Sequence, residues 1–140
     1  MIDRVGRVAV VTGASSGIGK EVAKFLARSG WRVIAQGRNT DRCAKAEHGI
    51  RQVASGGQVT MIRSDLSLMS EAASLADEIA ELTDRVDVLV NNAGGMASEL
   101  VLTSEGNDQN FAGNHLGPFL LTNRLIPLLR NAAKGAPVEA

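Results

Sequence analysis

The chain has 140 residues, of which 44% are hydrophobic, and its 15 basic and 15 acidic side chains give a formal net charge of zero. This length suits one domain of roughly 100–200 residues, and the hydrophobic content argues against a disordered chain. The charge balance argues against nucleic acid or an anionic membrane surface as a partner. No apolar run reaches the ~18 residues of a membrane span, and the N-terminal flank lacks the cleavage site of a signal peptide.

Cysteine and histidine usage limits the chemistry further. Cys43 is the only cysteine, so no internal disulfide can form, and a reducing compartment, the cytoplasm, is predicted. His48 and His115 fall on different predicted helices, without cysteine or acidic residues at the spacing of a metal-ligand set. We therefore predict no metal site.

The first apolar run, residues 8–11, is continuous rather than alternating, which is typical of a buried parallel strand. A helical pattern follows from Gly17 to Ser29, and Gly30 stands where a C-terminal cap belongs. The apolar residues of this helix have the spacing i, i+4, i+7 and i+8. They predict one apolar helix face made of Ile18, Val22, Phe25 and Leu26.

Three more strands and three more helices are predicted further along the chain. The strands span residues 31–36, 59–62 and 86–90. One helix begins at Asn39 or Thr40, runs to about residue 54 and is ended by Gly56-Gly57. Another begins at Ser67 or Ser70 and runs to about residue 82, and a last long helix spans roughly residues 111–130.

This alternation of strands and helices predicts βαβ units with right-handed crossovers. The expected fold class is α/β: a Rossmann-like, three-layer αβα arrangement on an incomplete parallel sheet of about four strands in the order 3-2-1-4. The fourth strand would then have an outer edge without a partner, and the last helix carries more apolar surface than one face requires. We expect self-association through that helix or that open edge.

The segment Thr12-Gly13-Ala14-Ser15-Ser16-Gly17-Ile18-Gly19 joins the first strand to the first helix. Its glycine spacing, G-x-x-x-G-x-G, differs from the G-x-G-x-x-G of the general dinucleotide fingerprint. Glycines let the backbone approach a pyrophosphate, and the free N–H groups at a helix start face its negative charge. The pattern therefore predicts a phosphate cradle, with a purely structural turn as the alternative. Ser15 and Ser16 would donate hydroxyl hydrogen bonds to phosphate, cap the helix, or do both.

Polar residues follow the other strands at the same edge of the sheet. Arg38 stands where an NAD-binding chain places an acidic residue, and a guanidinium pairs with the 2′-phosphate of NADP. NADP is therefore favoured over NAD, with a solvated arginine as the alternative. Asp65, after the third strand, could accept from an adenine amino group with Leu66 packing nearby, or serve as a turn residue. Asn91-Asn92-Ala93-Gly94 follows the fourth strand at the crevice where open α/β sheets bind ligands.

Together with Asn114, these motifs resemble those of the short-chain dehydrogenase/reductase family. The segment Asn114-His115-Leu116-Gly117-Pro118-Phe119-Leu120-Leu121-Thr122 is similar to the retinol dehydrogenase-like branch. Asn107 and Asn110 depart from that branch, which usually carries bulkier apolar residues in this region. The resemblance covers nearly the whole chain but only about the first half of a full family member.

The resemblance implies roles for individual residues. The pyrophosphate would be held by the glycine-rich segment, through Gly13, Ser15, Ser16, Gly17, Ile18 and Gly19. Arg38 would face the 2′-phosphate, and Asp65 and Leu66 would flank the adenine. The adenosine ribose and the sheet end would be lined by Asn91, Ala93 and Gly94. Asn114 would hold a backbone carbonyl and a water in the proton relay.

The family's catalytic serine and its Tyr-x-x-x-Lys pair would follow a fifth strand, yet the chain contains no tyrosine. Hydride transfer in this family needs a phenol whose pKa a nearby lysine lowers. We therefore expect one nucleotide-binding domain, residues 1–140, truncated before the fifth strand and without turnover alone. A small alcohol or carbonyl substrate is expected only in a full-length parent. The alternatives are a non-catalytic nucleotide-binding or regulatory module, and a piece that does not fold by itself.

Overall fold

The computed structural model describes residues 6–135 of the chain. Four strands form one parallel sheet: β1 (Val8–Val11), β2 (Arg32–Gly37), β3 (Val59–Arg63) and β4 (Val88–Val90). Their order is β3-β2-β1-β4, which confirms the predicted order 3-2-1-4. The fold is an incomplete Rossmann-like α/β sheet.

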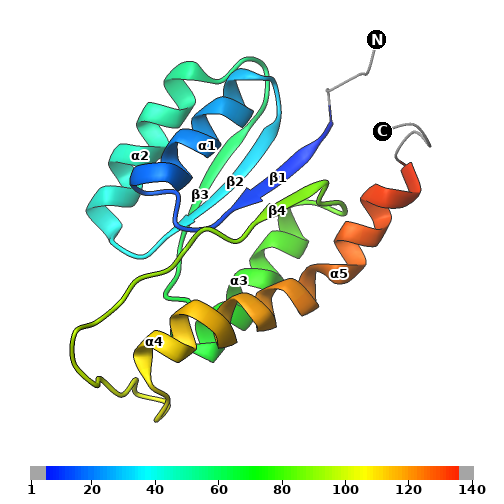
Figure 1. The fold of residues 1–140 in the computed structure, drawn as a ribbon. Coiled ribbons are helices and arrows are strands. Elements are labelled where there is room, and N and C mark those ends of the chain that lie inside the picture. The colour runs from blue at the N-terminus through cyan, green and yellow to red at the C-terminus, as the bar shows by residue number, and fades with distance from the viewer. Residues whose placement is uncertain (1–5, 136–140) are drawn as a thin grey trace.

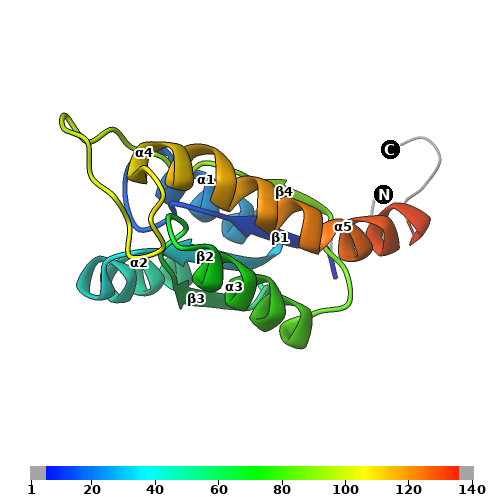
Figure 2. The same cartoon turned by 90° about the horizontal axis from the view of Figure 1, so that it is seen from below.

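The helices cover both faces of the sheet (Figures 1 and 2). One face carries α1 (Gly17–Arg28) and α2 (Thr40–Val53), and the other carries α3 (Met69–Leu82) and α5 (Gly117–Gly135). Two short elements precede α5: α4 (Gln109–Phe111) and the π-helix η1 (Ala112–Leu116). The layers are therefore helix, sheet and helix, as predicted. Among residues 6–135, no helix has both the length and the apolar character needed to cross a bilayer.

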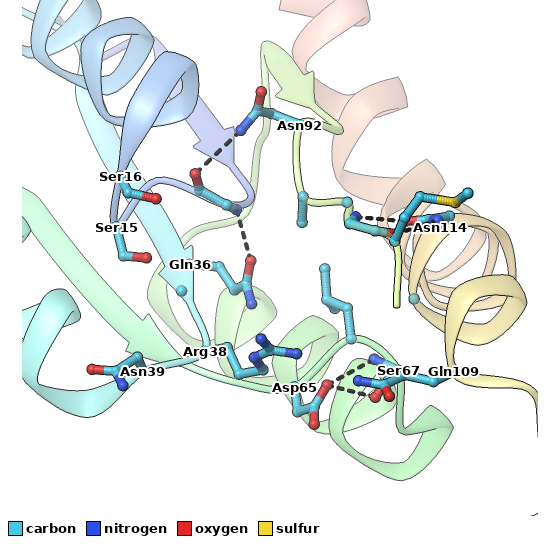
Figure 3. A pocket seen from close by; sticks show the side chains of 18 of the residues that line it. Ser15, Ser16, Gln36, Arg38, Asn39, Asp65, Ser67, Asn92, Gln109 and Asn114 are labelled. Atoms are coloured by element: carbon cyan, nitrogen blue, oxygen red, sulfur yellow. Dashed lines mark hydrogen bonds between the residues drawn. The ribbon is translucent and has the colours of Figure 1, made fainter. Parts of the chain in front are cut away.

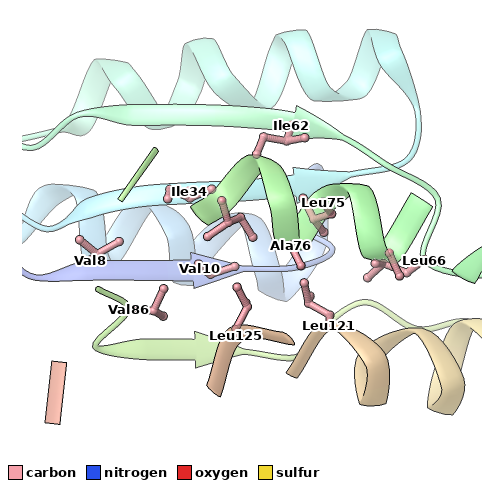
Figure 4. Close-up of a cluster of buried hydrophobic side chains, with 12 residues drawn as sticks. Val8, Val10, Ile34, Ile62, Leu66, Leu75, Ala76, Val86, Leu121 and Leu125 are labelled. Atoms are coloured by element: carbon pink, nitrogen blue, oxygen red, sulfur yellow. The ribbon is translucent and has the colours of Figure 1, made fainter. Parts of the chain in front are cut away.

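Side chains of each strand alternate between two hydrophobic cores, because successive residues of a strand point to opposite faces. The core beneath α3 and α5 is built from large aliphatic residues, among them Val10, Ile34, Leu75, Ile79, Leu121 and Leu125 (Figure 4). The core beneath α1 and α2 is built mainly from small residues: Val11, Ala14, Ala23, Ala27, Val33, Ala35, Ile50 and Val59. Small side chains permit a close approach of α1 to the sheet and to the glycine-rich turn.

The apolar face predicted for the first helix is wrong for two of its four residues. Ile18 is 77% exposed and Phe25 is 63% exposed, whereas the buried residues of α1 are Gly19, Ala23 and Ala27. A Cβ at Gly19 would collide with the Gly13 carbonyl, so this face of the helix accepts only the smallest residue at its first turn. The helix packs through its small residues, and two of its large ones point to solvent.

The predicted strand at residues 86–90 and the predicted helix at 111–130 also differ from the structure. Val86 is fully buried, but its amide donates to the Leu128 carbonyl of α5 (3.1 Å), so the strand begins only at Val88. The last helix begins at Gln109, passes through five residues of π-helix and continues to Gly135 with Pro127 inside it.

Candidate functional site

A cleft of about 540 Å³ opens at the carboxyl ends of the four strands (Figure 3). Open α/β sheets bind their ligands at this edge. The predicted site residues that line the cleft are Gly13, Ser15, Ser16, Arg38, Asp65, Leu66, Ala93, Gly94 and Asn114. Three further predicted residues form the first turn of α1 directly after Ser16: Gly17, Ile18 and Gly19. The predicted residue Asn91 does not line the cleft.

The start of the glycine-rich turn is held by hydrogen bonds within the protein. The Gly13 amide donates to Gln36 Oε1 (2.9 Å), and the Ala14 amide donates to the Gln36 carbonyl (2.8 Å). Asn92 Nδ2 donates to the carbonyls of Thr12 and Gly13 (3.2 Å each). This part of the turn therefore has its polar groups satisfied and is fixed to β2 and to the segment after β4.

Two glycines give the turn a path that other residues would strain. Gly13 has φ +62° and Gly17 has φ +55°, in the left-handed region that L-residues disfavour. A Cβ on Gly13 would also lie 2.8 Å from the Ala93 Cα. Glycine at position 13 therefore serves both the turn and the close contact with the β4 exit.

The amides from Ser15 to Gly19 differ from those at the start of the turn. Ser16 is the N-cap of α1, its side chain makes no capping hydrogen bond, and the first turn contains no acidic residue. The first intrahelical hydrogen bond runs from the Lys20 amide to the Ser16 carbonyl (3.2 Å). Within residues 6–135, no acceptor lies in hydrogen-bonding position for the amides of Ser15 and Ser16, and those of Gly17, Ile18 and Gly19 precede the helical ladder. The helix start therefore offers a run of uncompensated donors to an anion.

The side of the cleft after β2 carries positive charge. Arg38 follows β2 and Arg42 lies in the first turn of α2, and both line the cleft. Asn39 caps α2 by accepting a hydrogen bond from the Arg42 amide (3.0 Å). Arg63 Nε donates to the Arg38 carbonyl (3.0 Å), which fastens the end of β2 to the end of β3. Two exposed guanidinium groups thus face the cleft beside a capped helix start, an arrangement that favours a phosphate group.

Asp65 and Leu66 follow β3 and have internal partners as well. Asp65 Oδ1 accepts from the amide (3.0 Å) and the hydroxyl (2.7 Å) of Ser67, which is a turn interaction. The Asp65 amide donates to Glu71 Oε1 (3.1 Å). The Leu66 side chain belongs to the core beneath α3 and α5. Asp65 is therefore a turn residue, and its second carboxylate oxygen still has capacity to accept.

The segment after β4 divides its two asparagines between two tasks. Asn91 Nδ2 donates to Thr122 Oγ1 of α5 (3.0 Å), so its side chain is directed toward that helix. Asn92, which the sequence analysis did not select, lines the cleft and binds the glycine-rich turn. Its place beside Asn91 in the same motif was the available signal, but which asparagine faces the turn depends on the strand register.

Asn114 lies in η1 and fixes the chain after β4. Its Oδ1 accepts from the Gly95 amide (2.9 Å) and its Nδ2 donates to the Gly95 carbonyl (2.7 Å). Asn110, one helical turn earlier, makes the same pair of bonds with the Ala97 amide (2.7 Å) and carbonyl (3.2 Å). The two asparagines thus bind alternate residues of an extended segment, as a neighbouring strand would.

The loop that follows, residues 98–108, is anchored at a second point. The Glu105 carboxylate accepts from the amides of Met69 (2.6 Å) and Ser70 (3.1 Å), so it caps the N-terminus of α3. These hydrogen bonds hold the pKa of Glu105 below its usual value. Between the two anchors the loop exposes Leu100 and Leu102, which places apolar surface near one end of the cleft.

The sequence model of the short chain dehydrogenase family matches residues 7–139. Human retinol dehydrogenase 13 is 39% identical over 128 residues, which cover 91% of this chain and 39% of that protein. The Pseudomonas aeruginosa RhlG/NADP active-site complex superposes with a TM-score of 0.76 at 36% identity, covering 96% of this chain and 51% of the other. The NADH-dependent reductase A1-R′ complexed with NAD superposes with a TM-score of 0.77 at 30% identity, covering 95% and 56%.

The chain belongs to the short chain dehydrogenase family, because the family model spans almost its full length. It covers 39% of the length of the human relative and 51% and 56% of the two solved structures. Of these two similar structures, one is a complex with NADP and the other is a complex with NAD.

Proposed function

We propose that the cleft binds NADP, and that the chain is the cofactor-binding part of an oxidoreductase that transfers hydride between NADP(H) and an alcohol or carbonyl substrate. The observation that carries this proposal is the run of uncompensated amides from Ser15 to Gly19, next to the guanidinium groups of Arg38 and Arg42. A dinucleotide with an added 2′-phosphate carries its negative charge in two places, at its diphosphate and at its adenosine ribose. The cleft likewise has its free amides at the start of α1 and its guanidinium groups after β2, in two separate places.

In this proposal the diphosphate lies against the first turn of α1, with Ser15 and Ser16 donating and the glycines permitting close approach. Arg38 pairs with the 2′-phosphate, and Asp65 accepts from the adenine through its remaining acceptor capacity. Ala93 and Gly94 line the far wall, and a Cβ added at Gly94 would make a tight contact of 3.2 Å with Asn114 Oδ1. The bound nicotinamide supplies the hydride chemistry.

We assign Asn114 a positioning role, because both polar atoms of its carboxamide bind the Gly95 backbone. The chain contains no tyrosine, so it lacks the phenol that would exchange a proton with the substrate. We therefore propose that the chain alone binds the cofactor without turnover, and that substrate conversion belongs to a longer parent. The same zero tyrosine count favours a second candidate, a nucleotide-binding or regulatory module without catalysis.

Thermal unfolding of the 140-residue chain with and without dinucleotide tests binding. A ligand that binds only the folded state raises the midpoint. NADPH is expected to raise it more than equal NADH, and reduction of a carbonyl panel should not exceed the no-protein rate. A cooperative transition that neither nucleotide moves would overturn the proposed binding, and measurable carbonyl reduction would overturn the proposed lack of turnover.

Two wider expectations go with this proposal. The lone Cys43 is buried and forms no disulfide, which fits a reducing compartment such as the cytoplasm. Self-association is proposed through the last helix or through the outer edge of β4. In that helix Phe111 of α4 and Phe119 of α5 are exposed and stack on either side of His115 of η1. Sedimentation of the purified chain tests it, and a monomer at all accessible concentrations would contradict it.

A further inference from the structure

Gln36 lies near the carboxyl end of β2, the strand between β1 and β3, which lead into the two halves of the cleft. Its side chain is 3% exposed. Its Oε1 accepts from the Gly13 amide (2.9 Å; Figure 3), and its Nε2 donates to the Ser64 carbonyl (2.6 Å). Because the Gln36 carbonyl also accepts from the Ala14 amide (2.8 Å), one residue holds two successive amides of the glycine-rich turn.

The two side-chain partners of Gln36 belong to different parts of the site. Gly13 begins the turn that leads to the uncompensated amides of α1, whereas Ser64 directly precedes Asp65 on the other side of β2. A carboxamide presents an acceptor and a donor at once, which is what this pair of buried backbone groups requires. No apolar side chain could satisfy either group, and an unsatisfied buried group is costly.

We propose that Gln36 is a positioning residue that sets the spacing between the diphosphate-binding amides after β1 and the adenosine-binding groups after β2 and β3. This inference rests on the proposed binding of NADP. A dinucleotide engages both groups with one covalently linked molecule, so its affinity depends on their separation as well as on their presence. Both polar atoms of the carboxamide are engaged within the protein, so Gln36 acts through Gly13 and Ser64 rather than by touching phosphate.

This role is distinguishable from simple support of the fold. A ligand that occupies only one half of the cleft does not depend on the spacing between the halves. Adenosine 2′-monophosphate (2′-AMP) is such a ligand, because it carries the adenosine and the 2′-phosphate but no diphosphate. Loss of Gln36 should therefore weaken NADPH and spare 2′-AMP, whereas general loosening of the fold would weaken both.

The experiment compares Gln36→Met with the wild-type 140-residue chain in calorimetric titrations with NADPH and with 2′-AMP. Methionine has a similar length and no polar group, so the Gly13 amide and the Ser64 carbonyl lose their partner. We expect the Kd for NADPH to rise by about tenfold, the scale of one buried hydrogen-bonding group, and the Kd for 2′-AMP to stay within about twofold. Gln52→Met, the same change on the exposed surface of α2, should alter neither Kd.

The remaining outcomes decide against the proposal. Equal weakening of NADPH and 2′-AMP assigns Gln36 to general support, and an unchanged NADPH Kd removes any role. Should Gln36→Met fail to unfold cooperatively, Gln36→Asn, whose shorter side chain reaches one partner at most, takes its place with the same expected result. If neither variant folds, Gln36 supports the fold alone and the proposal is overturned. If the wild-type chain binds neither 2′-AMP nor NADPH, the proposed function itself is refuted.

Discussion

The two ends of the cleft are built in different ways. At one end, short turns after β1, β2 and β3 are fastened to one another by Gln36, Arg63 and Glu71, and they present free amides and guanidinium groups. At the other end, a long segment after β4 is held against α4 by Asn110 and against η1 by Asn114, and it exposes apolar side chains. The first end has the donors and charge for the phosphates of a dinucleotide.

This difference indicates where function resides in the chain. A set of charged groups on short turns is held by neighbouring strands, so it can be complete within four strands. The apolar end consists of a tethered loop and a helix start. Four kinds of variant should therefore differ in their effects on stability and on nucleotide affinity. They change the contact between the two ends of the cleft, the charged end, the apolar end, or the opposite edge of the sheet.

The largest effect is expected at Thr12, which joins the two ends. Its buried hydroxyl accepts from the amides of Asn92 and Ala93 (3.0 Å each) and donates to the Val90 carbonyl (3.3 Å). Thr12→Val keeps the shape, leaves the Ala93 amide without a partner and removes one of the hydrogen bonds at the Asn92 amide and at the Val90 carbonyl. The free energy of unfolding should therefore fall by about 3 kcal/mol. Urea denaturation measures it. Thr40→Val, an exposed counterpart at the start of α2, should change the free energy of unfolding by less than about 0.5 kcal/mol. If both variants lost the same stability, the role given to the Thr12 hydroxyl would be contradicted.

The charged end is tested alone by Arg38→Met. Loss of a charge-assisted pair costs about 1.5–3 kcal/mol, so the Kd for NADPH should rise roughly 10- to 100-fold. NADH lacks the 2′-phosphate, and its Kd should stay within about twofold. Fluorescence titration measures both constants, and Arg28→Met on the exposed end of α1 is the control. Parallel loss of NADH affinity would show that Arg38 does not read the 2′-phosphate.

The apolar end is tested by Asn110→Ala. This change removes both bonds to Ala97, so the amide of Ala97 should exchange with solvent about fivefold faster, which corresponds to about 1 kcal/mol. Because the charged end is untouched, the Kd for NADPH should stay within about twofold. Hydrogen exchange read by NMR measures the first effect, and Asn123→Ala, whose side chain bonds only within α5, is the control. Unchanged exchange at Ala97 would mean that the loop is held by other contacts.

The smallest effect is expected at Asp87, on the edge of the sheet opposite the cleft. Burial raises the pKa of this carboxylate, but hydrogen bonds from Arg85 and from the Val8 amide outweigh it and leave the pKa below its usual value. Since the folded pKa lies below the unfolded value of about 3.9, the stabilisation is complete above that value and is lost as the pH falls through the folded pKa.

The matching experiment compares Asp87→Asn with the wild-type chain at pH 6 and pH 3. The variant should be less stable by about 0.5–1 kcal/mol at pH 6, and the gap should narrow at pH 3. The exposed neighbour Asp84, changed to Asn, is the control. If the stability difference between the wild-type chain and Asp87→Asn widened toward low pH, the folded pKa of Asp87 would lie above its unfolded value, contrary to the prediction. A changed NADPH affinity would mean that this edge and the cleft are coupled.

The strand order and the glycine-rich turn could be predicted from the sequence, because both depend on local patterns. Continuous apolar runs mark buried parallel strands, and glycines at positions 13 and 17 mark a turn with positive φ. The family of the chain follows from the same local motifs. The position of Arg38 beside the cleft could be predicted because it needs only the end of β2 to be known.

The residues that hold the site together were not predicted, because their partners are distant in sequence. Gln36 binds groups 23 and 28 residues away, and Asn92 binds groups 79 and 80 residues away. The outward direction of Ile18 and Phe25 likewise depends on how closely α1 packs against the turn. Such choices are made by tertiary packing, which overrides helical periodicity.

The most direct test of the central claim is an equilibrium titration of the 140-residue chain with NADPH, followed by the nicotinamide fluorescence. We expect saturable binding of one nucleotide per chain, with NADH at least about tenfold weaker, since Arg38 contributes a charge-assisted pair only to NADPH. A chain that unfolds cooperatively, yet leaves the fluorescence unchanged at every concentration, would show that the free amides at the start of α1 do not bind a dinucleotide.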